Sequence, residues 1–144
     1  MTSYGLTIEL TVDIDTARPL VEAALAEQGF GVLTEIDVAA TMKTKLDVDV
    51  PGQLILGACN PGLAHRALGE EEAIGLLLPC NVTLRDTGSP DAPRTTVSTI
   101  DPAVMVGFTG NTGLQPVADE AGSRLRAALD ALAGRPVSDS DGAR

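Results

Sequence analysis

Two cysteines, each followed by an asparagine, are the residues of this chain whose types and spacing could do chemistry. Cys59 and Asn60 stand directly before a proline. Cys80 and Asn81 stand directly after one, and no other cysteine occurs among the 144 residues. Each pair ends a short apolar run, and a strand that breaks into a turn is a common place for reactive or binding side chains. The two pairs therefore predict a site for a small ligand or for thiol chemistry.

Asn60 and Pro61 are predicted to be the N-cap and the first residue of a helix. Cys59 has the better position for a reactive thiol, because it precedes this helix N-terminus, whose N–H groups and dipole favour a thiolate. The alternative is packing, since cysteine behaves as a small hydrophobic residue in an aliphatic strand. As an enzyme, the protein would use Cys59 as nucleophile and His65, the only histidine, as base. However, His65 is expected about 130° from the apolar stripe of its helix, which is typical of a solvated residue.

Metal and anion sites have weaker support in the sequence. The spacing of Cys59, His65 and Cys80 matches no common zinc finger and lacks a fourth ligand, so no metal is predicted and any cofactor is unknown. Lys43, one of only two lysines, could mark an anion subsite, although a solvated position is the alternative. The glycine-rich segment 107–113 is neither a dinucleotide-binding nor a Walker loop, and it is interpreted as a flexible connection.

The composition excludes several classes of partner. Twenty acidic and ten basic residues give a net charge of −10, which repels nucleic acid and anionic lipid. No apolar run approaches the ~20 residues of a membrane span, and the N-terminus begins as an alternating strand instead of a signal peptide. We therefore expect a cytoplasmic protein with no nucleic-acid or membrane partner, in which both thiols stay reduced.

The periodicity of apolar residues predicts the elements that must position the cysteines. Predicted strands span 4–13, 30–37, 52–59, 74–84 and 95–100, and predicted helices run from a cap at Asp15 or Thr16 to Gly29 and over 38–46, 61–68 and 117–132. The last two strands are expected to form a hairpin. The fold class is α+β, in the order β-α-β-α-β-α-β-β-α, with one domain over residues 1–133 and a disordered tail over 134–144.

Three details of these elements can be tested against a structure. The near-continuous apolar run 52–59 predicts a central strand covered on both faces. Pro79 cannot donate to a β-ladder and predicts a bulge or a sheet edge near Cys80. Met42 and Leu46 are expected to face inward from the short helix 38–46.

Several short motifs together resemble the DUF302 family over about residues 4–133. They are Ile55-Leu-Gly-Ala-Cys-Asn-Pro61, the stretch 64–68, Gly75-Leu-Leu-Leu-Pro-Cys-Asn-Val82, Gly29-Phe30 and Asp101-Pro102. The resemblance implies a compact α+β fold, usually dimeric, with helices packed on one side of a mostly antiparallel sheet. It implies no activity, because the family name records an unassigned function. It does indicate that the cysteine motifs are the place to look.

The sequence thus leaves two main hypotheses of function. In the first, a homodimeric cytoplasmic protein holds a small-ligand or thiol-dependent site at Cys59, Asn60, Cys80 and Asn81, with His65 and Lys43 as further candidates. In the second, the protein is a non-catalytic homodimeric interaction module in which the cysteine motifs are structural. An exposed apolar patch without a polar pocket would favour the second hypothesis.

Overall fold

The structure is a computed structural model that describes residues 3–134, and its strands form one five-stranded antiparallel sheet. The strands are β1 (Gly5–Leu10), β2 (Gly31–Asp37), β3 (Gln53–Cys59), β4 (Cys80–Asp86) and β5 (Thr95–Ile100), in the spatial order β1-β5-β4-β3-β2. The helices are α1 (Ile14–Glu27), α2 (Val38–Leu46), α3 (Pro61–Glu70), α4 (Ala103–Thr109) and α5 (Gln115–Ala133), with 3₁₀ turns η1 (Glu72–Leu77) and η2 (Thr112–Leu114). The α+β class and the β4–β5 hairpin are confirmed. The predicted tail lies outside the described residues, apart from Gly134.

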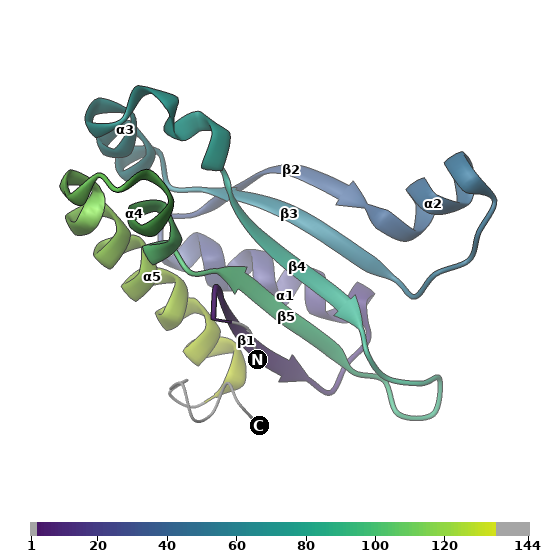
Figure 1. The fold of residues 1–144 in the computed structure, drawn as a ribbon. Coiled ribbons are helices and arrows are strands. Elements are labelled where there is room, and N and C mark those ends of the chain that lie inside the picture. The colour runs from purple at the N-terminus through teal and green to yellow at the C-terminus, as the bar shows by residue number, and fades with distance from the viewer. Residues whose placement is uncertain (1–2, 135–144) are drawn as a thin grey trace.

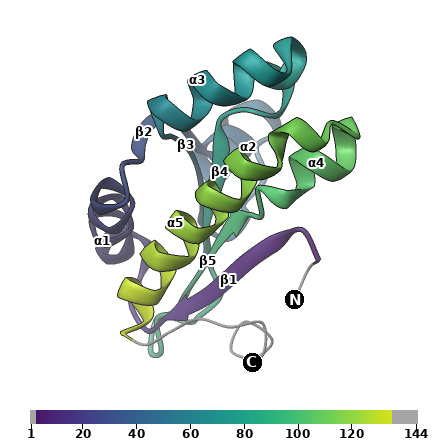
Figure 2. The same cartoon turned by 90° about the vertical axis from the view of Figure 1, so that its left-hand side faces the viewer.

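Helices α1 and α5 pack against each other over one face of the sheet (Figures 1 and 2). The alternation of β1, β3, β4 and β5 turns aliphatic side chains toward these helices, and they form the core: Leu6, Ile8, Leu56, Val82, Leu84 and Val97. The opposite face carries shorter polar side chains such as Thr7 and Ser98, whose hydroxyls lie 2.9 Å apart and are half-buried. β3 is an interior strand of the sheet, as predicted, but the prediction that it is covered on both faces is wrong, because Ile55 on the open face is only half-buried.

The two long helices follow their sequence signals closely. α5 occupies the predicted segment and buries its apolar stripe, which consists of Val117, Ala118, Ala121, Leu125, Ala128 and Leu129. α1 begins earlier than expected, because Asp13 is its N-cap and accepts a hydrogen bond from the backbone N–H of Thr16 at 2.8 Å. As a result Pro19 lies inside the helix instead of in its first turn. No helix of residues 3–134 is long and apolar enough to cross a membrane.

The segment before Cys80 differs from its prediction. Residues 72–77 form the 3₁₀ turn η1, the Leu78–Pro79 peptide bond is cis, and β4 begins only at Cys80. Pro79, which has no N–H to donate, thus stands before the ladder instead of inside it. The pairing of β3 with β4 is unbroken, so the predicted bulge at Cys80 is wrong. β4 pairs with β5 only from Val82 onward, so Cys80 has a ladder partner on one side alone, as the predicted sheet edge near it implies. The one irregularity of the described ladders lies in β2, between Val32 and Thr34.

The glycine-rich segment 107–113 is ordered into helical turns. α4 ends at Gly110, whose φ of 68° is the left-handed conformation that glycine adopts readily, and η2 follows at once. The Asn111 side chain donates hydrogen bonds to the Glu70 carbonyl and to Glu71 Oε1, both at 3.0 Å. The interpretation of this segment as a flexible connection is therefore wrong, and α4 is an element that the sequence did not predict.

Helix α2 stands apart from the other helices, at the far end of the β2–β3 pair (Figure 1). Its N-cap is Asp37, which accepts a hydrogen bond from the Ala40 N–H at 2.9 Å. The helix has no buried residue: Met42 is half-buried, and Leu46 is 65% exposed. The prediction that Leu46 faces inward is wrong, because most of the residue is exposed to solvent.

Candidate functional site

The two cysteine motifs meet because of the register between β3 and β4. Ala58 is the partner of Cys80 in the ladder, and Cys59 is the next residue and the last of β3. Asn60 and α3 follow without a gap. Both cysteines are free thiols. Antiparallel pairing thus joins two motifs that are separated in the chain by α3 and η1.

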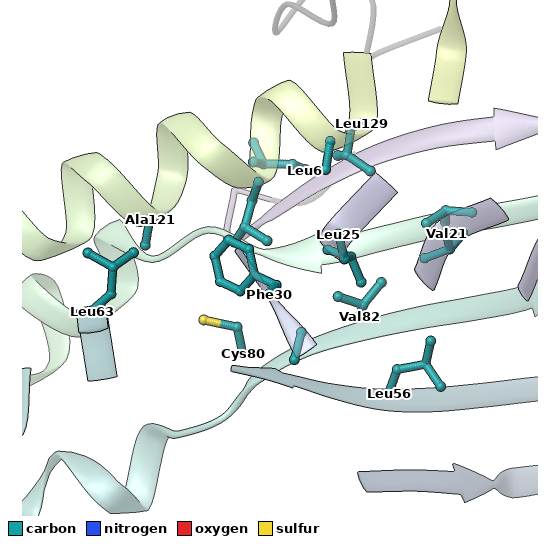
Figure 3. Close-up of a cluster of buried hydrophobic side chains, with 14 of the residues drawn as sticks. Leu6, Val21, Leu25, Phe30, Leu56, Leu63, Cys80, Val82, Ala121 and Leu129 are labelled. Carbon is teal, nitrogen blue, oxygen red and sulfur yellow. The ribbon is translucent and has the colours of Figure 1, made fainter. Parts of the chain in front are cut away.

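Both cysteines line one small cavity, which we call the thiol cavity. Its volume is about 30 Å³. The remaining lining residues, Asn60 apart, are apolar: Phe30, Ala58, Leu63, Ala64, Ala67, Leu78, Pro79, Met105, Val117 and Ala121. Figure 3 shows the Cys80 sulfur pointing away from β4 toward the space beside Leu63 and Phe30. The cavity therefore has room for a water-sized guest and is far smaller than the ~300–1,000 Å³ of sites for organic ligands.

The two thiols have different surroundings. Cys80 is 9% exposed, whereas Cys59 is partly exposed at the end of its strand. Burial, and to a smaller extent the nearby charge of Cys59, together raise the pKa of the Cys80 thiol to about 11. Cys80 is consequently protonated at neutral pH. Of the two, Cys59 is the thiol that a reagent in solution can reach.

The side chain of Asn60 is held in place by the helix it caps. Its Oδ1 accepts a hydrogen bond from the Leu63 N–H at 3.2 Å, and Pro61 occupies the first turn of α3. Its amide nitrogen lies against Gly29, where an added Cβ would approach it to 2.9 Å at a φ of 83°. Gly29 therefore allows the turn between α1 and β2 to close on the α3 cap. The prediction of Asn60 as a cap is confirmed.

Asn81 lies on the other side of β4 from the thiol cavity. It is exposed and lines a second hollow of about 280 Å³, the apolar groove, between η1 and α4. Leu76 and Phe108 in its lining are 87% and 77% exposed. Cys80 and Met105 line both the thiol cavity and the groove. The structure therefore brings Cys59, Asn60 and Cys80 together and places Asn81 in a neighbouring hollow.

The other two candidate residues lie away from the cysteines. His65 is exposed on α3 and does not line the thiol cavity. Lys43 lies on α2, where its ammonium forms ion pairs with Asp47 at 3.2 Å and with Asp49 at 3.4 Å. These two carboxylates neutralise the Lys43 charge that would otherwise attract an anion.

Two residues that line the thiol cavity were not predicted from the sequence. Met105 contributes from α4, and Phe30 contributes from the start of β2, although neither belongs to a cysteine motif. The signal for Met105 was the apolar run 103–106 after Asp101-Pro102, which is too short to show a helical period. Within residues 3–134, no group of three or more His, Cys, Asp or Glu side chains is arranged to hold a metal ion.

Comparisons with known proteins match this chain to a family for which no function is known. The sequence model of the domain of unknown function DUF302 matches residues 6–132. A crystal structure of an uncharacterized conserved DUF302 protein from Bacillus stearothermophilus is similar, with a TM-score of 0.79 and 27% identity over 90% of this chain and 98% of that chain. No curated protein matches the chain.

Proposed function

The chain belongs to the DUF302 family, whose function is unknown, and from its own site we propose that it acts through a thiol-dependent binding site at the thiol cavity. In this function Cys59 is the reachable thiol and Cys80 is its buried partner. The observation that carries the proposal is that both cysteines, from different strands, are lining residues of one cavity. We place the activity in the cytoplasm, where both thiols remain reduced.

Three properties of the cavity support this proposal. Cys59 is partly exposed at the surface end of the cavity, next to the N-terminus of α3, where the helix dipole favours a negative charge. Cys80 is held protonated, so it does not compete as a nucleophile. Asn60 is fixed by its capping hydrogen bond and supplies the one polar side chain besides the thiols.

Selective alkylation of the native protein tests the proposal. The full chain is treated with iodoacetamide at pH 7.5, and peptide mapping by mass spectrometry follows modification at each cysteine. We expect modification of Cys59 within minutes and modification of Cys80 only after addition of denaturant. Cys59→Ala and Cys80→Ala are the matched controls, and each should remove only its own modified peptide.

Two outcomes would contradict the proposal. Protection of both cysteines in the native protein would mean that both are packing residues. Equal reaction of both cysteines would mean that the reagent reaches them equally well, and the assignment of Cys59 as the reachable thiol would be wrong.

A second function is favoured by the exposed apolar side chains around α2. Leu46, Val48 and Val50 are 65%, 41% and 40% exposed, and Ile36 at the end of β2 is 51% exposed. Several exposed apolar side chains on one segment of the chain are typical of an interaction surface. The corresponding proposal is a homodimer that buries this segment between two copies of the chain.

Sedimentation velocity of the full chain tests the dimer. We expect a dimer that Leu46→Asp converts to a monomer, because an aspartate buried in an apolar interface is costly. Leu20→Asp is the matched control, since Leu20 is 50% exposed on α1, away from this segment. A monomeric wild-type protein, or a Leu46→Asp variant that remains dimeric, would rule this interface out.

A further inference from the structure

The size of the thiol cavity limits what it can hold. A volume of about 30 Å³ admits a single water-sized guest, whereas organic ligands need roughly ten times more. Water itself is a poor guest, because it needs two to four hydrogen-bonding partners and the walls are almost entirely apolar. A guest of atomic size that binds to sulfur would suit this cavity better.

Three sulfur-bearing residues line the cavity from three different elements. Cys59 comes from the end of β3, Cys80 from the start of β4, and Met105 from α4. Met105 is 6% exposed, so its thioether is held inside the fold. The Cys80 sulfur points into the space that Leu63 and Phe30 border (Figure 3). Thiolates and thioethers are soft ligands, and soft ligands select soft metal ions.

We infer that the thiol cavity is a binding site for a soft monovalent cation of the Cu(I) type, with Cys59, Cys80 and Met105 as its sulfur ligands. The inference rests on the proposed thiol site and names its ligand. Zinc fits less well, because its protein sites use four Cys, His or carboxylate ligands and thioethers are not among them. Iron–sulfur clusters need four protein ligands and more room than the cavity offers.

The surroundings suit such an ion in two further respects. Cys59 and Asn60 lie at the partly exposed rim, so an ion can reach Cys59 first and then move to the buried sulfurs. The thiol protons leave to solvent as the metal–sulfur bonds form, which leaves no bare thiolate in the apolar interior. The apolar walls exclude water and thereby protect a monovalent copper ion from oxidation.

An anaerobic Cu(I) titration of the full chain against the chromogenic chelator bicinchoninate tests the inference. We expect one Cu(I) per chain, with an affinity high enough to remove copper from the chelator. Met105→Leu keeps the volume of the side chain and removes its sulfur, and it should weaken binding by about tenfold or more. Met42→Leu on α2 is the matched control and should bind as the wild type does. Thermal unfolding of each variant confirms that it is folded.

The outcomes separate this inference from the proposed function. Loss of affinity in Met105→Leu but not in Met42→Leu supports the site. Absence of a one-to-one complex, or equal affinity of Met105→Leu and wild type, overturns the Cu(I) assignment. If Cys59 is still alkylated selectively in that case, the thiol site stands without the metal. Should Cys80→Ala fail to fold, the pair of methionine variants still decides the question.

Discussion

The two helices at the ends of the β2–β3 pair begin with the same kind of side-chain N-cap, but only one of them is buried against the rest of the fold. α2 is capped by Asp37 and α3 by Asn60, each through a side-chain oxygen that accepts a backbone hydrogen bond. α3 nevertheless buries Leu63 and Ala67, while α2 buries nothing. The difference lies in what covers them, because α3 packs against α5 and η1, whereas the main contacts of α2 are with its own two strands. A cap and an apolar stripe start a helix, but only a second layer gives it a core.

This contrast also explains where a cavity can form. At the α3 end, side chains from β2, β3, β4, α3, α4 and α5 converge, and imperfect packing among them leaves the thiol cavity. At the α2 end, the apolar side chains stay partly exposed and form part of the surface. The first end suits an enclosed ligand, and the second suits a partner.

The largest expected effect comes from truncating one leucine at each end. Leu63→Ala on α3 should lower the free energy of unfolding by about 2–5 kcal/mol, since Leu63 is 6% exposed and its loss enlarges a cavity. Leu46→Ala on α2 should change it by less than about 0.5 kcal/mol. Urea denaturation of both variants measures the difference. Equal losses would mean that α2 is covered in solution.

Alkaline pH should weaken the covered end specifically. Below pH 9, folded and unfolded chains both keep the Cys80 proton, so its raised pKa contributes nothing. Between pH 9 and about 11 the unfolded chain loses the proton first, and the free energy of unfolding should fall by about 2–3 kcal/mol. Denaturation of metal-free protein at several pH values should show this loss in wild type and not in Cys80→Ala. An identical pH dependence in both proteins would mean that Cys80 is not buried as described.

Between the two ends, the open face of the sheet is close-packed at one position. A Cβ added to Gly57 would overlap the Thr34 hydroxyl and approach Pro79 Cγ to 2.7 Å. Gly57→Ala should therefore cost about 1–3 kcal/mol of unfolding free energy. Thr34→Ala in the same chain should recover part of that loss, because it removes the nearer obstacle. A Gly57→Ala variant as stable as wild type would show that this face is loose along its whole length.

The smallest expected effect concerns one ion pair, between α3 and α5. Arg66 of α3 donates a hydrogen bond to Glu120 of α5 at 2.9 Å, and this bond, with help from Arg124, holds the pKa of Glu120 below its usual 4.5. Its contribution is present above pH 4.5 and is lost as the pH falls through the lowered pKa. The melting temperature of Glu120→Gln should lie slightly below that of wild type at pH 7, with the gap closing in acid. Exposed pairs contribute little, so a gap of many degrees would contradict this assignment.

Much of the fold could be predicted from local pattern. The alternation in β1, the apolar stripe of α5 and the Asn60 cap are signals carried within a few neighbouring residues, and each was confirmed. The predictions that were wrong concern residues whose state depends on distant partners. Leu46 was expected inside because its spacing is helical, yet it is 65% exposed. The helix α4 was missed because its seven residues are too few to show a period.

The sequence by itself determined the position of Cys59 at a strand end, the Asn60 cap beside it and the aliphatic character of the core. Only the tertiary structure decided that Ala58 pairs with Cys80, that Met105 joins them from α4, and that Asn81 turns to a separate groove. The physical reason is that strand register and layer packing are set by contacts between residues far apart in the chain. A shift of one residue would turn Cys80 to the other face of the sheet, and no local signal in either motif prevents it.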